Sequence, residues 1–169
     1  ILEFAIALES CQAKSGQGML PITLVRRGKT EEVVLDVGQE YGTYAQSFPF
    51  DCPKTERIRH QLYQYLVDHQ GEDGSWGIPP QDTFAPLALL ASGEKPHLEA
   101  VKKNVQMHAR TTSAEDDSWL INWRYMAAAI VMSEYYLATE EKWVLKELEE
   151  VYAFLISSQY INMDQINEK

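Results

Sequence analysis

The apolar positions change their period once along the chain, which separates a short mixed segment from a longer helical one. Residues 3–14 place apolar side chains at helical spacing, and the glycine-containing run 15–18 ends this predicted helix. Two β-like runs, 20–26 and 32–37, lie on either side of a predicted turn at 27–30. Helix, strand, turn and strand predict a small α+β piece that is too short to bury a core alone.

Residues 38–53 predict a linker, because they hold two glycines and two prolines and show no sustained period. Beyond them the pattern is helical. We expect five helices, over 53–70, over 84–91, from Pro96 onward, over 119–138 and over 140–159. The apolar face expected for the first of these consists of Ile58, Leu62, Tyr65, Leu66 and His69. The predicted domains are therefore 1–38 and 54–169, joined by the linker 39–53.

Two of the predicted helices end in similar sequences. Residues 62–70 (LYQYLVDHQ) align with residues 151–159 (VYAFLISSQ), and tyrosine, leucine and glutamine coincide at three positions. Similar helix ends separated by other helices are typical of repeat arrays, which bury their core by stacking neighbouring repeats.

The N-terminal segment resembles part of a known domain. The run 20–29 (LPITLVRRGK), followed by 33–37 (VVLDV), is similar to the closing two strands of a bacterial PDZ-like domain. The resemblance implies that residues 3–14 are the helix beside the peptide groove, and that the carboxylate-binding loop and the strand that a peptide augments precede Ile1. We therefore expect no PDZ-type peptide capture by this chain.

The turn after the first long helix carries a second resemblance. Gln70, Gly74 and Trp76 match the glutamine–tryptophan motif of α/α-toroid proteins, which include squalene and other terpene cyclases and the protein prenyltransferase β subunits. The resemblance implies a structural role, in which the glutamine amide bonds backbone groups at helix ends and the tryptophan ring packs on the next repeat. The second copy departs from the motif, since no Gly-x-Trp follows Gln159.

The order of these parts, the linker residues 48–53 and the helix end 133–139 resemble a poorly characterised bacterial family that joins a PDZ-like domain to such repeats. It implies a mainly α fold, a partial α/α toroid of about five helices preceded by a PDZ-like C-terminal fragment. It implies no established reaction. Because the chain begins at Ile1, we expect it to be a piece of a longer protein. No signal peptide is visible, and the compartment stays open, with export of the full-length protein one option.

The charge narrows the classes of partner. A net charge of −10 argues against nucleic acid, which requires clustered Lys and Arg. Residues 119–137 approach the length of a membrane span, but Arg124 and Glu134 interrupt them, so we expect a buried helix and no membrane insertion. Cys11 and Cys52 show no metal-site spacing, and we expect two free thiols.

The sequence shows no recognisable catalytic or metal-binding motif. The Asp-x-Asp-Asp and Asp-Asp-x-x-Asp motifs of cyclases and isoprenyl synthases do not occur. The nearest acidic run, 115–117, is interpreted as the N-terminus of the fourth predicted helix. The four histidines are scattered, and no phosphate loop is present, so we predict no metal site and no cofactor.

The fourth predicted helix holds the best functional candidates. Glu134 falls on the same side as Trp123, and a carboxylate on an apolar helix must be paired, hydrogen-bonded or facing a cavity. With Trp119, Trp123 and Tyr135 it would bind a peptide or glycan, or act as an acid. The alternative is a buried glutamate bonded to the backbone or to an arginine.

Two functions follow for the whole chain. We predict a non-catalytic scaffold or ligand-binding repeat protein. The alternative is an α/α-toroid enzyme acting on a glycan or isoprenoid, with catalytic residues largely outside this fragment. The sequence leaves the oligomeric state open.

Overall fold

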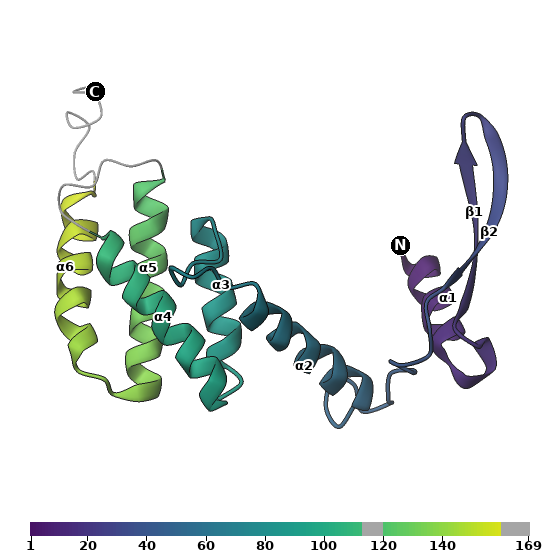
Figure 1. Cartoon of the computed structure of the whole chain (residues 1–169), viewed down its shortest axis with the longest axis horizontal. Coiled ribbons are helices and arrows are strands. Elements are labelled where there is room, and N and C mark those ends of the chain that lie inside the picture. The colour runs from purple at the N-terminus through teal and green to yellow at the C-terminus, as the bar shows by residue number, and fades with distance from the viewer. Residues whose placement is uncertain (113–119, 160–169) are drawn as a thin grey trace. The chain divides into compact units, whose positions relative to one another are not determined.

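The computed structural model describes residues 1–112 and 120–159, and the chain forms two compact units, Ile1–Leu62 and Tyr63–Lys169 (Figure 1). We call these unit 1 and unit 2. The prediction of a mainly helical chain is confirmed: the described residues form six α-helices and one two-stranded antiparallel sheet. Among these helices, none has both the length and the apolar character needed to cross a membrane.

Unit 1 begins with helix α1 (Leu2–Gln12), a short 3₁₀ turn (Lys14–Gly16) and the hairpin of β1 (Met19–Arg26) and β2 (Lys29–Asp36). The predicted four-residue turn is wrong, because β2 already starts at Lys29, which pairs with Arg26. Arg27 and Gly28 alone make the turn, with φ of 53° and 75°. Two successive residues of positive φ match the right-handed twist of a hairpin.

Residues 37–52 contain neither helix nor strand. They lead into α2 (Pro53–Asp68), which contributes to both units. The domain boundaries predicted at 38 and 53 stay a prediction, since the compact units divide later, between Leu62 and Tyr63. Both cysteines are free and buried, Cys11 at the end of α1 and Cys52 directly before α2.

Unit 2 contains the end of α2 and four further helices, α3 (Pro79–Leu90), α4 (Lys95–Thr111), α5 (Ile121–Thr139) and α6 (Trp143–Ser157). Helix α5 contacts α3, α4 and α6, and α3 also contacts α4 (Figure 1). The core gathers around this central helix. Its members with no exposed surface are Leu89, Val101, Val105, Ala128, Val131, Met132, Val144 and Val151.

The apolar face predicted for α2 is only partly correct, since Leu66 packs against the core but other members of the face do not. Leu62 and Tyr65 are each 57% exposed, whereas Tyr63, Leu66 and Val67 pack against the core of unit 2. The centres of the predicted face and the packed face lie about 100° apart around the helix. The apolar residues of both faces repeat every three to four positions. Periodicity alone could not choose between them.

Candidate functional site

The turn that joins α2 to α3 forms a hydrogen-bonded clasp, which we define as residues 70–76. The Gln70 amide Nε2 donates to the Gly74 carbonyl at 3.0 Å and to the Ala100 carbonyl of α4 at 2.7 Å. The Gly71 N–H donates to the Ser75 carbonyl at 2.8 Å, which closes the turn. One side chain thereby joins the turn after α2 to the backbone of α4.

Trp76 joins the clasp to both neighbouring helices. Its indole Nε1 donates to the Leu66 carbonyl at 2.8 Å, and its partly buried ring packs against the core. Its backbone N–H donates to the carboxylate of Asp82 at 2.6 Å, and the Ser75 hydroxyl donates to the same carboxylate at 2.8 Å. Asp82 is only 5% exposed, so these donors replace the water that its charge would otherwise need.

Helix α4 completes the polar cluster behind the clasp. The amide Nδ2 of fully buried Asn104 donates to the Gly74 carbonyl at 3.0 Å and to Asp82 at 3.2 Å. Nε2 of His108 lies 3.4 Å from the Asp82 carbonyl, which can only accept, so Nε2 carries the proton. Burial lowers the pKa of His108, although Asp82 acts in the opposite direction. The imidazole is therefore neutral at pH 7.

The second predicted copy of the motif has different surroundings. The Gln159 side chain is exposed, and among the described residues it has no hydrogen-bond partner. The helix faces differ as well, since Tyr152 of α6 is 66% exposed while the aligned Tyr63 of α2 packs on the core. The residues after Gln159 lie outside the described part of the chain.

The candidates predicted on the fourth helix are not brought together. Glu134 is exposed on α5, and Trp123 is 51% exposed. Tyr135 is 1% exposed and faces the core. The exposed Glu134 is not the buried glutamate, bonded to the backbone or to an arginine, that one expectation described. Its role in binding a ligand or as an acid stays a prediction. Trp119 and the acidic run 115–117 lie outside the described residues.

Tyr135 belongs instead to a polar junction of three helices. Burial raises the pKa of its hydroxyl well above the ordinary value, and Glu141 acts in the same direction. The Glu141 carboxylate accepts from Lys102 of α4 at 2.9 Å and from the Trp143 indole of α6. Lys102 and then Trp143 hold the pKa of Glu141 below its usual range. We interpret this junction as structural, because Glu141 already accepts hydrogen bonds from Lys102 and Trp143.

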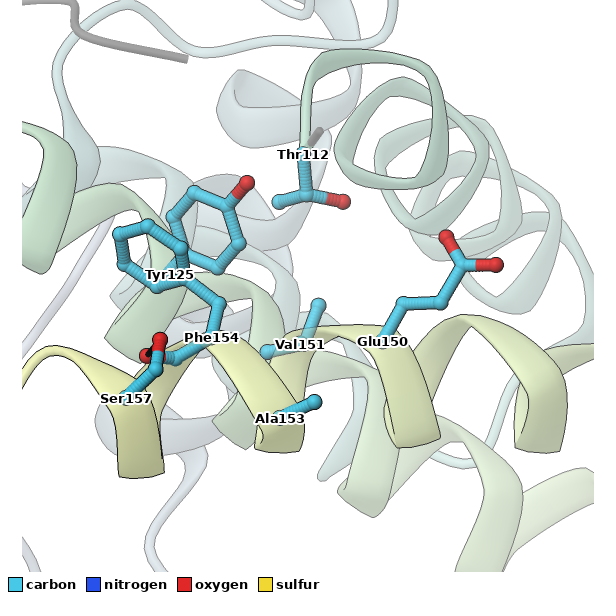
Figure 2. Close-up of a pocket in the computed structure, with 7 residues that line it drawn as sticks. All are labelled: Thr112, Tyr125, Glu150, Val151, Ala153, Phe154 and Ser157. Atoms are coloured by element: carbon cyan, nitrogen blue, oxygen red, sulfur yellow. Dashed lines mark hydrogen bonds between the residues drawn. The ribbon is translucent and has the colours of Figure 1, made fainter. Parts of the chain in front are cut away.

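A cavity of about 480 Å³ lies beside α5 and α6, and we call it the α5–α6 pocket. Figure 2 shows the Glu150 side chain on one side of it and the rings of Tyr125 and Phe154 on the other, with Val151 between them. The two rings are stacked, with centroids 3.7 Å apart and planes inclined by 22°. Thr112 and Ser157 add hydroxyl groups to the lining.

The electrostatics of the α5–α6 pocket are simple. Glu150 is the one charged side chain among the described residues that line it. Its ion pair with Lys146, 3.4 Å long and one helical turn away, joins two side chains that are more than half exposed. Such a pair contributes little free energy and leaves the carboxylate open to a competing cation.

The sequence reasoning missed this pocket. Its only signal is on α6, where Glu150, Phe154 and Ser157 follow one another at spacings that place them on one helix face. Tyr125 comes from α5 and Thr112 from the end of α4, and no periodicity connects those helices to α6.

Fold and sites together define a mainly helical protein with a hydrogen-bonded clasp between helices and a small pocket whose described lining contains one carboxylate. A family model described as a domain of unknown function (DUF6288) matches residues 55–165, and the chain belongs to this family. No curated protein matches the chain, and no solved structure does. Among the described residues, no group of three or more histidine, cysteine, aspartate or glutamate side chains is placed to hold a metal ion.

Proposed function

We propose that the chain is a non-catalytic, ligand-binding repeat protein, with unit 2 built as part of an α/α toroid. The clasp supports this proposal. In toroid families the motif glutamine bonds the backbone at helix ends, and here Gln70, which follows the end of α2, bonds the backbone carbonyls of Gly74 in the turn and of Ala100 within α4. The contacts of α5 with α3, α4 and α6 fit helices that pack on their neighbours along and across the array.

The proposal for unit 1 is a C-terminal fragment of a PDZ-like domain. It is supported by the order α1, β1, β2 and by the contact of α1 with β1. Val25 and Val34 of the hairpin are 74% and 58% exposed, and a two-stranded hairpin alone is marginally stable. Further strands would give those side chains a place to pack.

The α5–α6 pocket carries the ligand-binding part of the proposal. Its volume of about 480 Å³ lies in the range of small-molecule sites, which run from about 300 to 1,000 Å³. Among the described residues, its walls are apolar apart from one carboxylate and the hydroxyl groups of Thr112, Tyr125 and Ser157. The ligand that fits is the basic side chain of a peptide, whose aliphatic stem contacts Ala153 and Phe154 while its cation reaches Glu150.

A glycan fits this pocket less well. Sugars stack on an open aromatic face, but Tyr125 is 2% exposed and one face of its ring is covered by Phe154. Among the two ligand classes that the sequence left open, the pocket therefore favours a peptide. Glu134, the carboxylate that an enzyme would have used, does not line this pocket.

The proposal is tested by titrating the ¹⁵N-labelled chain with three blocked small molecules and following amide chemical shifts. N-acetyl-lysine methylamide should perturb α5 and α6 in a saturable way. N-acetyl-norleucine methylamide, which lacks the cation, should bind at least ~10-fold more weakly, as should methyl glucoside. Loss of one charge-assisted hydrogen bond corresponds to roughly this factor.

Glu150→Gln should reduce lysine binding to the level of norleucine. Glu149→Gln is the matched control, because it removes the same charge from an exposed neighbour on α6 that does not line the pocket. Equal binding of lysine and norleucine, or equal effects of the two variants, would sink the proposal.

A further inference from the structure

A polar pocket of about 720 Å³ lies within unit 1, and we call it the unit 1 pocket. Three segments line it: the end of α1 with the 3₁₀ turn, residues 39–43, and the first turns of α2. These segments are far apart in sequence and are held together locally. The Gln39 amide donates to the Ala13 carbonyl at 2.6 Å and to the Lys14 carbonyl at 3.2 Å, which fixes residues 39–43 beside the end of α1.

Positive charge gathers in this pocket although the chain as a whole carries −10. Lys14, Lys54 and Arg57 line it, and Glu40 is the one acidic residue in the lining. Lys14 and Arg57 are exposed, and neither forms an ion pair with a described residue. Their cations are therefore available to a ligand.

The buried Lys54 side chain is held in place by hydrogen bonds to residues of α1. It is 5% exposed and donates to Glu9 at 2.5 Å and to Gln12 at 2.8 Å, and its ammonium lies 4.5 Å from the ring centroid of Tyr44. Burial would raise the pKa of Glu9, but the bonds from Lys54 and from the Tyr44 N–H hold it below its usual value. Glu9 therefore neutralises Lys54, and Lys14 and Arg57 together with the acidic Glu40 leave one net positive charge in the described lining.

Helix α2 adds to the same field. Pro53 and Lys54 open this helix of 16 residues and line the pocket, so its positive dipole end lies at the site. An arginine whose planar fork is free is the side chain best suited to bind an oxyanion with two parallel hydrogen bonds. Arg57 meets that requirement.

We propose that the unit 1 pocket binds an oxyanion group, phosphate or carboxylate, carried by a small molecule. Lys14 and Arg57 bind the anion, and the start of α2 orients it. The pocket is larger than inorganic phosphate requires, so the remaining volume accommodates the organic part of the ligand. This site goes beyond the proposed function, since it lies in the other unit and selects the opposite charge.

The test is a titration of the full chain with sodium phosphate and, in a second arm, with sodium succinate, at pH 7 and at constant ionic strength set with sodium chloride. Amide shifts of residues 12–14, 39–43 and 53–57 should move in a saturable way. Phosphate alone, succinate alone or both giving this response identifies which oxyanion the pocket takes. No saturable response to either one, or an equal response to added chloride, overturns the proposal.

The double variant Lys14→Gln/Arg57→Gln should weaken oxyanion binding at least ~10-fold. The matched control is Arg26→Gln/Lys29→Gln, which removes one arginine and one lysine that pair across the hairpin and are exposed. Neither pair contributes to the buried Lys54–Glu9 bond, so folding is preserved and checked by the unchanged dispersion of the amide spectrum. Equal losses in the two double variants would show long-range screening and contradict a built site.

Discussion

At the scale of single residues, the structure separates polar groups that hold the fold from those that can meet a ligand. The Asp82 carboxylate and the amide NH₂ groups of Gln70 and Asn104 bond the backbone or one another. Among the described residues, the buried Oδ1 of Asn104 has no partner. Glu150 and Arg57 are exposed side chains in the linings of cavities. Candidate binding residues are therefore recognised as exposed charged side chains that line a cavity.

His108 gives unit 2 a pH dependence. Burial lowers its pKa, so below about pH 6.5, the ordinary value, the unfolded chain takes up a proton that the native chain does not. Stability should fall as pH drops from 7 to 5.5, with a slope from this group of at most about 1.4 kcal/mol per pH unit. Urea unfolding followed by circular dichroism at several pH values measures the slope.

His108→Gln should flatten this slope, because glutamine can still donate toward the Asp82 carbonyl but does not titrate in this range. His60→Gln is the control, since His60 is exposed and its removal should leave the slope unchanged. A slope that persists in His108→Gln would assign the pH dependence to another group.

At the scale of elements, the backbone of the clasp turn lies so close to the backbone of α4 that no side chain fits between them at Gly74. Gly74 has φ of +96°, and a Cβ there would come within 2.4 Å of the Lys103 carbonyl oxygen of the α4 backbone. Gly74→Ala should therefore separate the turn from α4 and break the bonds of Gln70 and Asn104 to the Gly74 carbonyl. We expect a loss of about 3 kcal/mol or more in the free energy of unfolding, measured by urea titration.

Gly93→Ala separates the two causes of this loss. Gly93 also has positive φ, +68°, but a Cβ there meets nothing within 4 Å. Its cost should be that of the backbone conformation alone, about 1 kcal/mol. If Gly74→Ala costs no more than Gly93→Ala, the close approach to α4 does not constrain the clasp.

The sequence predicts the elements better than their ends and faces. The hairpin and all five helices after residue 52 were expected, because periodicity and turn residues are local signals. Helix α3 starts at Pro79, five residues before the predicted start, since a proline pair can open a helix as well as end one. The bonds of Asp82 and Gly74 to Asn104 span 22 and 30 residues, which no local pattern contains.

At the scale of the whole molecule, the two units differ in how much they bury. Unit 2 has a core of fully buried apolar side chains around α5, whereas every side chain of β2 in unit 1 is exposed or only partly buried. Local stability follows buried apolar contact. We therefore expect amide hydrogens of β1 and β2 to exchange at least ~10-fold faster than those of α4 and α5, after correction for intrinsic rates.

Native-state hydrogen exchange followed by NMR measures this difference strand by strand. The buried Val101 and Val105 amides of α4 serve as the slow reference, and the exposed residues at the start of α1 as the fast one. Equal protection of β1, β2 and α5 would mean that the chain unfolds as one cooperative unit.

The hydrogen bonds of the clasp also define a sequence motif by which similar turns can be recognised. Glutamine stands four residues before the glycine, aspartate six residues after the tryptophan, and asparagine 30 residues after the glycine. A stretch with only the glutamine, glycine and tryptophan would lack two hydrogen-bond partners. The tryptophan N–H would lose the aspartate, and the glycine carbonyl would lose the asparagine. Further repeats of this kind should therefore be sought by all five residues at these spacings. A helix end that carries the glutamine without the glycine and tryptophan, as at Gln159, should not be counted as such a repeat.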